Sequence, residues 1–595
     1  MNLNHKQLDP LVNRSRVVKG SPAVVDRVPH RITQPAADPE NPYRNTHLGL
    51  FQDVIKDESS EERPYAFYIP TTMKTSGNMV LVMIPGKEDP AEFFHKYSWQ
   101  ESLERHAMTG YFISAPRGWK LEDPGFEIDV AVKVLAEMRS MEYFPCNAPS
   151  VYCMGFGDGA KIASIFSILY ISYLAAWSAW GDTELDPALI AQIGNGPSDC
   201  DASLRRADVA LPTYIIGEKS NVVSFFKSAC RVKQEYLYNG FARVFREKAR
   251  PGTSYINDEA CSEVWLSNDE SAEQLGADII IEKMIGFMSG YQRWAGEANH
   301  YIRRTMLAER DLHLIRTDKI INGLKRYWYT FEPSAYQRGL QDKYPLVIAI
   351  HGFSCSGEFF AQNSGWHRVG EERNAFVVYP TAYPYSTPPD PNPGSPARTG
   401  IATPHWNSGG FRGLAIDDNG PDDVDFFRQL LEITLEKYPV DPERVYVTGH
   451  SNGSMMTQRL MRKMPEKFAG FAPVGAMECR SSKTEPPVDG IKRNVWYTMG
   501  EFDGLGCSLE GDNANNWTLE MICEANGMNS SIRKSYSTGI YMHTIIRDAE
   551  SVPFVRFTGV KNWPHTYSPE LAFMIYDEFF SRFLRHEDGR LEYLA

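Results

Sequence analysis

The sequence predicts an α/β protein made of two consecutive domains, each a mostly parallel β-sheet flanked by helices. The chain has 595 residues, which exceeds the usual size of one domain. Short apolar runs alternate with segments long enough for helices, which is the pattern of βαβ units. The same order of runs recurs in the second half, so one plan is used twice.

The repeat begins with an aromatic strand that ends in proline, at 63–70 and again at 326–333. An apolar strand that ends in glycine follows, at 78–86 in the first copy and at 344–352 in the second. Continuous apolar runs are typical of strands buried on both faces of a parallel sheet. Three further pairs keep the order: 110–116 with 375–380, 150–155 with 444–449, and 212–217 with 495–500.

These matches divide the chain into two domains, a connector and an extension. We expect the domains at 44–295 and 311–595. Residues 296–310 are charged and are predicted to form a helical connector. Residues 1–43 are polar and contain proline, so we expect them to lie along the surface or to be partly disordered.

Composition and charge exclude several classes of partner. The hydrophobic fraction of 42% and the charged fraction of 23% are those of an ordinary soluble globular protein. A net charge of -13 argues against nucleic acid and anionic membranes as partners, because both need basic contacts. The nine cysteines lack metal-ligand spacing, and we expect neither a metal nor an organic cofactor.

The N-terminal residues contain no apolar stretch typical of a signal peptide, so we expect a cytoplasmic protein with free thiols. In an oxidising compartment Cys479, Cys507 and Cys523 are close enough in sequence to pair. Residues 162–180 are uncharged and long enough to cross a bilayer. The repeat instead predicts a buried helix followed by a buried strand in this segment.

Residues 449–453 read G-H-S-N-G, the only G-x-S-x-G motif in the chain. A predicted strand leads in at 445–448, and a helix is predicted from about Ser454. Strand, tight turn and helix in this order predict a nucleophile elbow, in which glycines relieve steric clashes and the serine adopts a strained backbone. Ser451 is therefore the predicted nucleophile. The alternative is a serine in a glycine-rich turn without a chemical role.

A serine nucleophile needs a base, and the base needs an acid that orients it. After a nucleophile elbow, the acid comes next in the chain and the histidine comes last. Asp503 follows the predicted strand 495–499 and is the expected acid. Glu501 and Asp512 are weaker candidates, and an Asp before Gly is on its own more often a turn residue.

The expected base is His565, which lies between the last predicted strand, 554–559, and the last predicted helix, 569–584. The alternative is His543, which lies inside the strand-like run 540–546. Acyl transfer through a serine also needs donors for the oxyanion of its tetrahedral intermediate.

Two backbone N–H groups are expected to form this oxyanion hole. One belongs to Asn452, directly after the nucleophile, and the other to Phe353, in the loop after the strand 344–352. Ser354 is the second choice for that loop.

The C-terminal half resembles the polyhydroxybutyrate-depolymerase-like esterases, a family of α/β-hydrolases that includes feruloyl and acetyl-xylan esterases. The resemblance rests on 344–352, 422–427 and 440–453 and covers roughly 320–585. It implies tandem α/β-hydrolase folds of which the second is a serine carboxylic ester hydrolase. The implied route is an acyl-enzyme, and aromatic or short-chain acyl esters are the expected substrates. The implied triad is Ser451, Asp503 and His565.

The chain departs from the family pattern at three places. Asn452 and Ser454 stand where the family has a small residue and a glycine, and the pair Trp563 and Pro564 precedes His565 instead of following it. The run 417–423 is acidic, but we expect it to open a helix at 422–438 and not to bind a cation.

The segment 380–420 is rich in proline, glycine and aromatic residues and is too long for a plain connector. We expect it to line the substrate pocket, because the family has a Trp-Asn pair near the substrate at this place. The alternative is an Ω-loop packed by its own aromatic rings. The candidate substrate contacts are Tyr383, Tyr385, His405, Trp406, Asn407 and, in the elbow, His450.

The first copy is predicted to be catalytically inactive. Its elbow has Gly157 at the nucleophile position, and Ser220 falls near the position of the acid. No histidine occurs between His106 and His300, so the base is missing too. Asp158 is one place past the elbow apex and is an unlikely nucleophile. The inactive domain is expected to act as a lid, to bind substrate or to form a homo-oligomer.

Other functions remain open at this point. A polyester depolymerase uses the same triad, as do a serine peptidase and an acyltransferase. A non-catalytic scaffold is the alternative from a different class, and the three candidate catalytic residues of the second copy argue against it.

Overall fold

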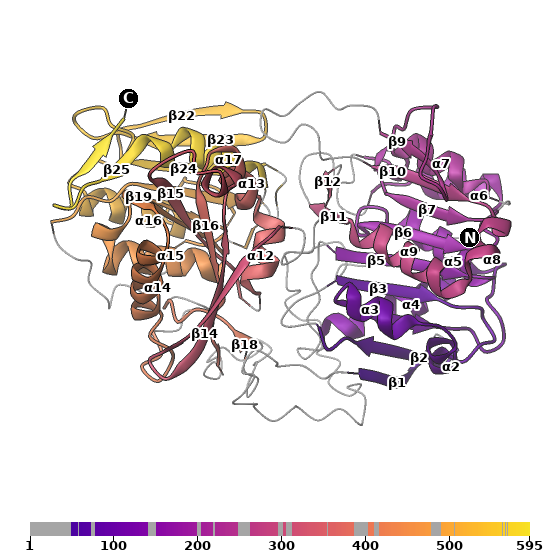
Figure 1. Cartoon of the computed structure of the whole chain (residues 1–595). Helices are drawn as coiled ribbons and strands as arrows, with labels where there is room; N and C mark the ends of the chain where they lie inside the picture. Colours follow the sequence, from indigo (N-terminus) through magenta and orange to yellow (C-terminus); the bar gives the residue numbers. More distant parts are fainter. Residues whose placement is uncertain are drawn as a thin grey trace. The chain divides into compact units, whose positions relative to one another are not determined.

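The computed structural model describes two compact units, drawn in Figure 1: the N-terminal unit, up to Arg304, and the C-terminal unit, from Leu312. The described residues are 49–57, 59–72, 78–140, 150–198, 204–217, 220–247, 262–294, 301–304, 312–353, 355–385, 403–409, 416–477, 490–501, 503–504, 506–561, 563, 565, 567 and 569–594. The predicted extension at 1–43 lies outside them.

The N-terminal unit is a ten-stranded sheet between two layers of helices. Across the sheet the strands are β1 (Gly49–Lys56), β2 (Glu62–Ile69), β4 (Met108–Ile113), β3 (Asn78–Met83), β5 (Val151–Phe156), β6 (Ala176–Trp180), β7 (Thr213–Ile216), β10 (Glu263–Ser267), β9 (Arg243–Arg246) and β8 (Leu237–Tyr238). One face is covered by α2 (Pro90–Lys96), α3 (Trp99–Arg105), α8 (Asp269–Leu275) and α9 (Ala277–Ser289). The other face is covered by α4 (Pro124–Ser140), α5 (Gly159–Leu169), α6 (Pro187–Gly194) and α7 (Val222–Ala229).

The C-terminal unit has the same layers. Its sheet runs β13 (Ile315–Ile321), β14 (Leu324–Phe331), β16 (Phe376–Pro380), β15 (Tyr344–Ile350), β19 (Val440–His450), β20 (Gly470–Val474), β21 (Val495–Gly500), β24 (Val555–Val560), β23 (Tyr541–Ile546) and β22 (Arg533–Thr538). The helices are α11 (Ser334–Gln337), α12 (Gly357–Ser364), α13 (Trp366–Glu372), α14 (Asp423–Lys437), α15 (Asn452–Lys463), α16 (Ala514–Ala525) and α17 (Pro569–Glu578). Two short ribbons complete it: β17 (Pro384–Tyr385) with β18 (Thr403–Pro404), and β25 (Phe583–Arg585) with β26 (Leu591–Tyr593).

The two sheets have the same strand order, position by position, as the sequence repeat predicts. In each, the six central strands are parallel, and antiparallel strands extend both edges. Parallel neighbours require crossover connections, which the helices supply. The predicted fold class, two α/β domains in tandem, is confirmed.

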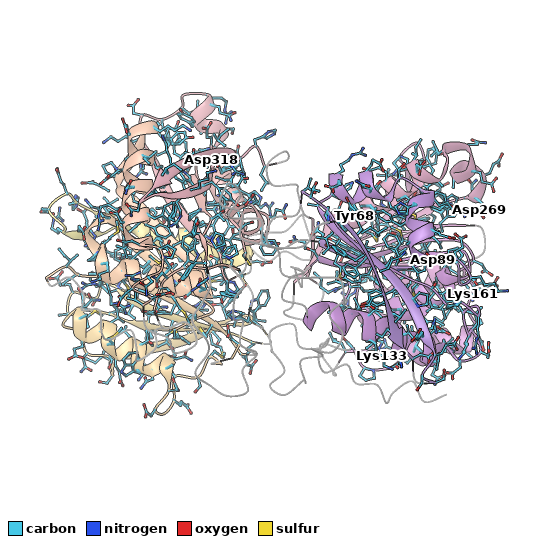
Figure 2. The ribbon with its side chains drawn as sticks, turned by 90° about the horizontal axis from the view of Figure 1, so that it is seen from below. Tyr68, Asp89, Lys133, Lys161, Asp269 and Asp318 are labelled. Atoms are coloured by element: carbon cyan, nitrogen blue, oxygen red, sulfur yellow. The ribbon has the colours of Figure 1, made fainter. Side chains whose placement is uncertain are left out.

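Local sequence explains where several helices start. Asp89, which is labelled in Figure 2, precedes α2. Its carboxylate accepts hydrogen bonds from the N–H groups of Ala91 and Glu92. Asp186 caps α6 in the same way, and both helices begin with proline. An acidic cap followed by proline suits the first turn, where N–H groups have no partner inside the helix.

Two expectations about local structure meet different outcomes. Residues 162–180 form the end of the buried helix α5 and then the strand β6, as predicted. In the part of the chain that is described, no helix is long and apolar enough to cross a membrane. The expected helical connector is wrong at 301–304, which form strand β12 paired with β11 (Tyr291–Trp294). Tyrosine and isoleucine favour a strand there, and β11 satisfies its backbone groups.

The sheets also correct the sequence match at two strands. Met83 lies opposite Gly155 and Ile350 lies opposite Gly449, so Met83 corresponds to Ile350 and not to Ala349. The last repeated strand shifts as well. The N–H of Gly181 donates to Ile216, and the N–H of Gly475 donates to Thr498. Ile216 therefore corresponds to Thr498 and not, as the sequence match suggests, to Met499. The repeat is present at this strand, but the pairing shifts by one residue.

Candidate active site

Ser451 lies at a sharp turn between β19 and α15. Its φ is 57° and its ψ is −118°, a strained conformation for a residue other than glycine. Its N–H donates to the carbonyl of Val474 (2.8 Å), and its carbonyl accepts from the N–H of Met455 (3.1 Å). A Cβ added to Gly449 would lie 2.2 Å from the carbonyl oxygen of Gly453. The turn therefore forms only with glycine two residues before the serine.

Asp503 and His565 are hydrogen-bonded to each other. Nδ1 of His565 lies 2.8 Å from Oδ2 of Asp503, and the two side chains are 30% and 7% exposed. An ionised carboxylate only accepts hydrogen bonds, so Nδ1 carries the proton and Nε2 has the free lone pair. This is the tautomer that a general base needs. The two residues come from the loops after the neighbouring parallel strands β21 and β24.

The alternative residues lie elsewhere. His543 is inside β23, is buried and pairs with the hydroxyl of Thr558 (2.9 Å). Burial lowers the pKa of His543 to about 4. Glu501 and Asp512 have exposed side chains, whereas Asp503 is nearly buried beneath His565.

The end of β20 brings the elbow and the histidine loop together. A Cβ added to Gly475 would lie 3.0 Å from Nε2 of His450 and 3.4 Å from Cε1 of His565. Gly475 follows Val474, whose carbonyl binds the N–H of Ser451. The rings of His450 and His565 are 4.8 Å apart, and burial holds the pKa of His450 well below its usual value. An uncharged His450 therefore packs beside His565.

The two predicted oxyanion donors lie at the ends of neighbouring parallel strands. Asn452 is the first residue of α15, where N–H groups have no acceptor within the helix and the helix dipole is positive. Phe353 follows β15 in a turn closed by the N–H of Cys355 and the carbonyl of Gly352 (3.3 Å). Ser354 lies outside the described residues. An anion at the carboxyl ends of β15 and β19 would meet these loops.

The side chain of Asn452 ties the elbow to the segment 403–409. Its Oδ1 accepts from the N–H of Trp406 (2.6 Å), and its Nδ2 donates to the carbonyl of Trp406 and to Oγ of Ser408 (both 3.1 Å). All three contacts are buried. The residue that departs from the family pattern thus fixes the segment above the nucleophile.

Trp406 and Asn407 are engaged inside the protein. Trp406 is 1% exposed, and its Nε1 donates to the carbonyl of His351 (2.9 Å). The amide of Asn407 bonds to both backbone groups of Asp417 (2.8 and 3.0 Å) and to the carbonyl of Pro421 (3.1 Å). The two side chains therefore hold the loop together, as the Ω-loop alternative describes, and are not free to contact a substrate.

Three other aromatic candidates lie at different depths. The rings of Tyr385 and His405 stack at 3.8 Å, and His405 lies 5.4 Å from the ring of Phe353. Tyr383 is half-buried just after β16. The stack therefore adjoins the predicted oxyanion loop.

A buried ion pair that the sequence analysis missed supports the same loop. Arg326 and Asp423 are 2.7 Å apart, and both are buried. The second carboxylate oxygen of Asp423 accepts from the N–H of Asn407 (2.8 Å). Asp422 caps α14 through the N–H of Asp425, so the acidic run opens a helix as predicted. One feature of the sequence could have indicated this pair: an arginine, Arg63 or Arg326, begins the first matched strand in both halves.

The N-terminal unit contains a copy of this cluster. Arg63 and Glu127 form a buried pair at 2.7 Å, and Glu127 accepts from the N–H of Lys120 (3.1 Å). Trp119 donates through Nε1 to the carbonyl of Ile84 (2.9 Å). An arginine, a carboxylate and a tryptophan thus occur together in both units. Because the first unit has no serine at its elbow, the cluster serves the fold and not the chemistry.

The first elbow keeps the geometry of the second. Gly157 has a φ of 55°, and its N–H donates to the carbonyl of Trp180 (3.0 Å). The carboxylate of Asp158 accepts from the N–H of Gly86 (2.9 Å). Ser220, near the expected acid position, accepts from the hydroxyl of Thr183 (2.6 Å).

The structure describes two of the three cysteines that were candidates for pairing. Cys507 and Cys523 are thiols, and Cys479 lies outside the described residues. Burial raises the pKa of Cys523 to about 11. Within the described ranges, no three histidine, cysteine, aspartate or glutamate side chains converge as metal ligands.

The strand order and the elbow define the C-terminal unit as an α/β-hydrolase domain. The N-terminal unit has the same fold without a nucleophile at its elbow. Residues 406–519 match the model of the prolyl oligopeptidase family, peptidase S9. This match includes Ser451 and Asp503 and ends before His565.

Curated relatives confirm the resemblance to depolymerases and esterases. Poly(3-hydroxyalkanoate) depolymerase C of Paucimonas lemoignei is 23% identical over 255 residues, which are 38% of this chain and 56% of that protein. Acetylxylan esterase A of Aspergillus ficuum is 30% identical over 124 residues, 21% of this chain and 35% of that protein. The chain thus spans little more than half the length of the first and about a third of the second.

Solved structures with some similarity also include esterases. An acetyl xylan esterase from Aspergillus awamori is 17% identical with a TM-score of 0.32, covering 45% of this chain and 99% of that chain. A feruloyl esterase module from Clostridium thermocellum is 13% identical with a TM-score of 0.30, covering 46% and 88%.

Proposed function

We propose that the C-terminal unit hydrolyses carboxylic esters with Ser451 as nucleophile, His565 as general base and Asp503 as the acid that orients it. The observation that carries the proposal is the bond between His565 and Asp503 beside a strained elbow. A serine hydroxyl is a weak nucleophile, and a base held in the correct tautomer activates it.

The proposed reaction has two steps, acylation and deacylation. Nε2 of His565 takes the proton of Ser451 as Oγ attacks the ester carbonyl. The N–H groups of Asn452 and Phe353 stabilise the negative oxygen of the tetrahedral intermediate. Collapse transfers the proton from His565 to the departing alcohol and leaves an acyl-serine. Water, deprotonated by His565, then attacks this ester, and collapse of the second intermediate releases the acid as His565 returns the proton to Oγ of Ser451.

Aromatic or short acyl esters are the proposed substrates. The partly exposed rings of Phe353, in the oxyanion loop, and of Tyr385, which stacks on His405, offer planar surfaces to an acyl group. The names of the relatives point to acetylated polysaccharide and to polyester, and a polyester depolymerase is the first alternative.

A serine peptidase is the second candidate, because residues 406–519 match the prolyl oligopeptidase model. An amide is attacked by the same triad, but its amine leaves less readily than an alcohol. The rates on an ester and on an amide that carry the same acyl group distinguish the two activities.

The test is the rate of hydrolysis of p-nitrophenyl esters of increasing acyl length, methyl ferulate, acetylated xylan, poly(3-hydroxybutyrate) and a peptide p-nitroanilide. Each is measured with the native chain, with Ser451→Ala and with Ser220→Ala. We expect ester turnover that is lost in Ser451→Ala and kept in Ser220→Ala. Turnover that persists in Ser451→Ala contradicts the assignment, and anilide cleavage faster than ester cleavage favours the peptidase.

A further inference from the structure

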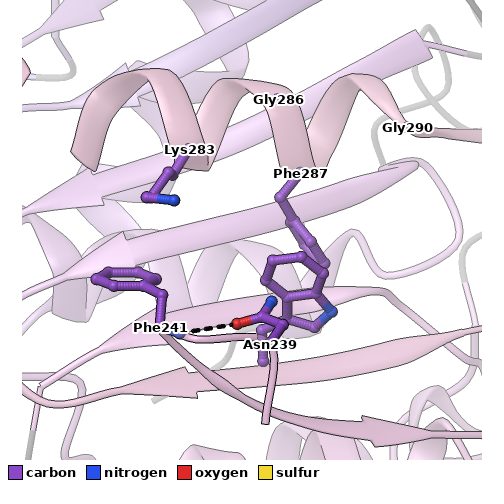
Figure 3. Close-up of a pocket in the computed structure, with 7 residues that line it drawn as sticks. Asn239, Phe241, Lys283, Gly286, Phe287 and Gly290 are labelled. Atoms are coloured by element: carbon purple, nitrogen blue, oxygen red, sulfur yellow. Dashed lines mark hydrogen bonds between the residues drawn. The ribbon is translucent and has the colours of Figure 1, made fainter. Parts of the chain in front are cut away.

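The N-terminal unit has a pocket of its own, away from its inactive elbow. It lies between α9 and the turn that joins β8 to β9 (Figure 3). Its volume is about 320 Å³. It is lined by Asn239, Phe241, Trp265, Lys283, Gly286, Phe287 and Gly290.

The polar side chains at this pocket offer hydrogen-bond donors. Oδ1 of Asn239 already accepts from the N–H groups of Phe241 (3.1 Å) and Ala242 (2.8 Å), which leaves its Nδ2 for a ligand (Figure 3). Lys283 places its ammonium group 5.0 Å from the centre of the Phe241 ring and has no carboxylate partner among the described residues. An ammonium and an amide N–H select a ligand that accepts hydrogen bonds and carries negative charge.

The remaining walls are aromatic. The rings of Trp265 and Phe287 are 5.1 Å apart, and the ring of Phe241 lies beneath the ammonium group of Lys283 (Figure 3). The indole N–H of Trp265 is satisfied by the buried carboxylate of Glu263 (2.7 Å), so the indole presents its apolar surface. A flat aromatic ring fits such walls better than a flexible aliphatic chain, because ring-to-ring contact adds to burial of area.

The C-terminal unit closes the same place with an ion pair. Trp265 pairs with Tyr214 across the sheet, as Arg556 pairs with Trp496. Arg556 therefore takes the place of Trp265. Its guanidinium binds Glu578 (3.1 Å) and lies 3.9 Å from the ring of Trp496.

The helix positions correspond as well. The hydroxyl of Tyr152 donates to the carbonyl of Tyr291, and the hydroxyl of Tyr446 donates to that of Phe583. Gly286 lies five residues before Tyr291, and Glu578 lies five residues before Phe583. These two positions therefore correspond. One copy thus has a buried arginine paired with an exposed carboxylate where the other has an indole and no side chain.

We propose that this pocket binds a small aromatic carboxylate, with its ring against Phe241 and Trp265 and its carboxylate on Lys283 and Nδ2 of Asn239. The ligand supplies the negative charge that Glu578 supplies in the other copy. This site is independent of the proposed esterase function, since no residue of the elbow takes part in it.

The test is isothermal titration calorimetry of the full chain with 2-naphthoate and with the uncharged 2-naphthamide. We expect 2-naphthoate to bind at least tenfold more tightly than 2-naphthamide. Lys283→Met should weaken 2-naphthoate at least tenfold and leave 2-naphthamide nearly unchanged, and Lys283→Arg should restore binding. Lys233→Met, on the surface of the same unit, is the matched control and should bind as the native chain does.

A second pair of variants tests the comparison between the units. Gly286→Glu adds a carboxylate to the pocket lining, one helical turn from Lys283 on α9, and should abolish binding, whereas Gly286→Ala should retain it. An added Cβ at Gly286 lies 3.6 Å from His106, an ordinary contact, so both variants are expected to fold. Equal affinity for the two ligands, or 2-naphthoate binding that Lys283→Met leaves unchanged, would overturn the proposal.

Discussion

The carboxylate of Asp158 accepts a hydrogen bond from the N–H of Gly86 in the N-terminal unit, at 2.9 Å. Asn452, at the same place in the second elbow, instead bonds to Trp406 at 2.6 Å. Gly86 belongs to the loop that corresponds to the predicted oxyanion loop. A carboxylate there would repel the negative oxygen of a tetrahedral intermediate. The first unit therefore disfavours acyl transfer for two reasons: its elbow has no serine, and a carboxylate occupies the oxyanion position.

Restoring that serine should not restore activity. Gly157→Ser, made in the Ser451→Ala chain, is expected to show no ester turnover above the Ser451→Ala background. Gly157 has a φ of 55°, so the serine is strained, and among the described residues a Cβ there meets only Pro85 within 4 Å, not a histidine. The rate on p-nitrophenyl acetate checks this. Turnover above that background would show that the first elbow needs only a nucleophile.

Asp503→Asn should reduce kcat by about 10⁴-fold, the loss typical of an amide that favours the wrong histidine tautomer. Folding should be little affected, because asparagine has the shape of aspartate and fills the same nearly buried place. Steady-state kinetics with a circular dichroism melt measures both effects. Asp512→Asn, on the exposed loop nearby, is the control and should retain full activity. A loss below tenfold in Asp503→Asn would remove this residue from the triad.

Asn452→Ala should slow catalysis and also destabilise the C-terminal unit. The change leaves the N–H and the carbonyl of Trp406 buried without their partner, which costs about 1–3 kcal/mol per group. The elbow would lose its link to the segment above it. We expect kcat to fall more than KM rises, together with a lower melting temperature.

Asn419→Ala provides the matched control for that experiment, since Asn419 is exposed in the same loop. It should change neither the kinetics nor the melting temperature. Unchanged kcat in Asn452→Ala would mean that the link to Trp406 has no part in positioning the oxyanion donor.

Breaking the buried ion pair of each unit should destabilise that unit alone. Arg326→Met leaves Asp423 charged and unpaired, and Arg63→Met does the same to Glu127. Loss of one partner of a buried pair typically costs about 3–5 kcal/mol. Hydrogen exchange followed by mass spectrometry would assign the loss of protection to residues of one unit. Only Arg326→Met should reduce ester turnover, and an equal loss in Arg63→Met would contradict this.

The C-terminal unit should lose stability as the pH falls from about 6.5 to about 4. Burial lowers the pKa of His351, His367 and His543 to about 4. The unfolded chain therefore binds more protons in this range, and the stability from the neutral histidines is present above it. The slope is up to about 1.4 kcal/mol per pH unit for each histidine.

Urea unfolding at pH 7 and pH 5 measures the effect. His367→Gln should reduce the difference between the two pH values, because an amide can still donate to the carbonyl of Ala361 and does not titrate. Equal stability at both pH values would show that these histidines do not titrate as buried groups.

Local patterns in the sequence were enough for much of the fold and of the candidate site. The apolar runs predicted the parallel strands, because burial on both faces leaves a continuous run. The elbow was predicted from five residues, because its backbone requires glycine on both sides of Ser451. The expected helical connector was wrong at 301–304, where pairing with β11 outweighed the charged composition.

The sequence by itself thus determined the two copies, the order of their elements and the candidates for nucleophile, acid and base. Only the tertiary structure decided that His565 and not His543 meets Asp503, and that Trp406 bonds to Asn452. These partners lie 62 and 46 residues apart. Hydrogen bonds across such separations depend on how strands and loops pack, and local periodicity carries no information about that packing.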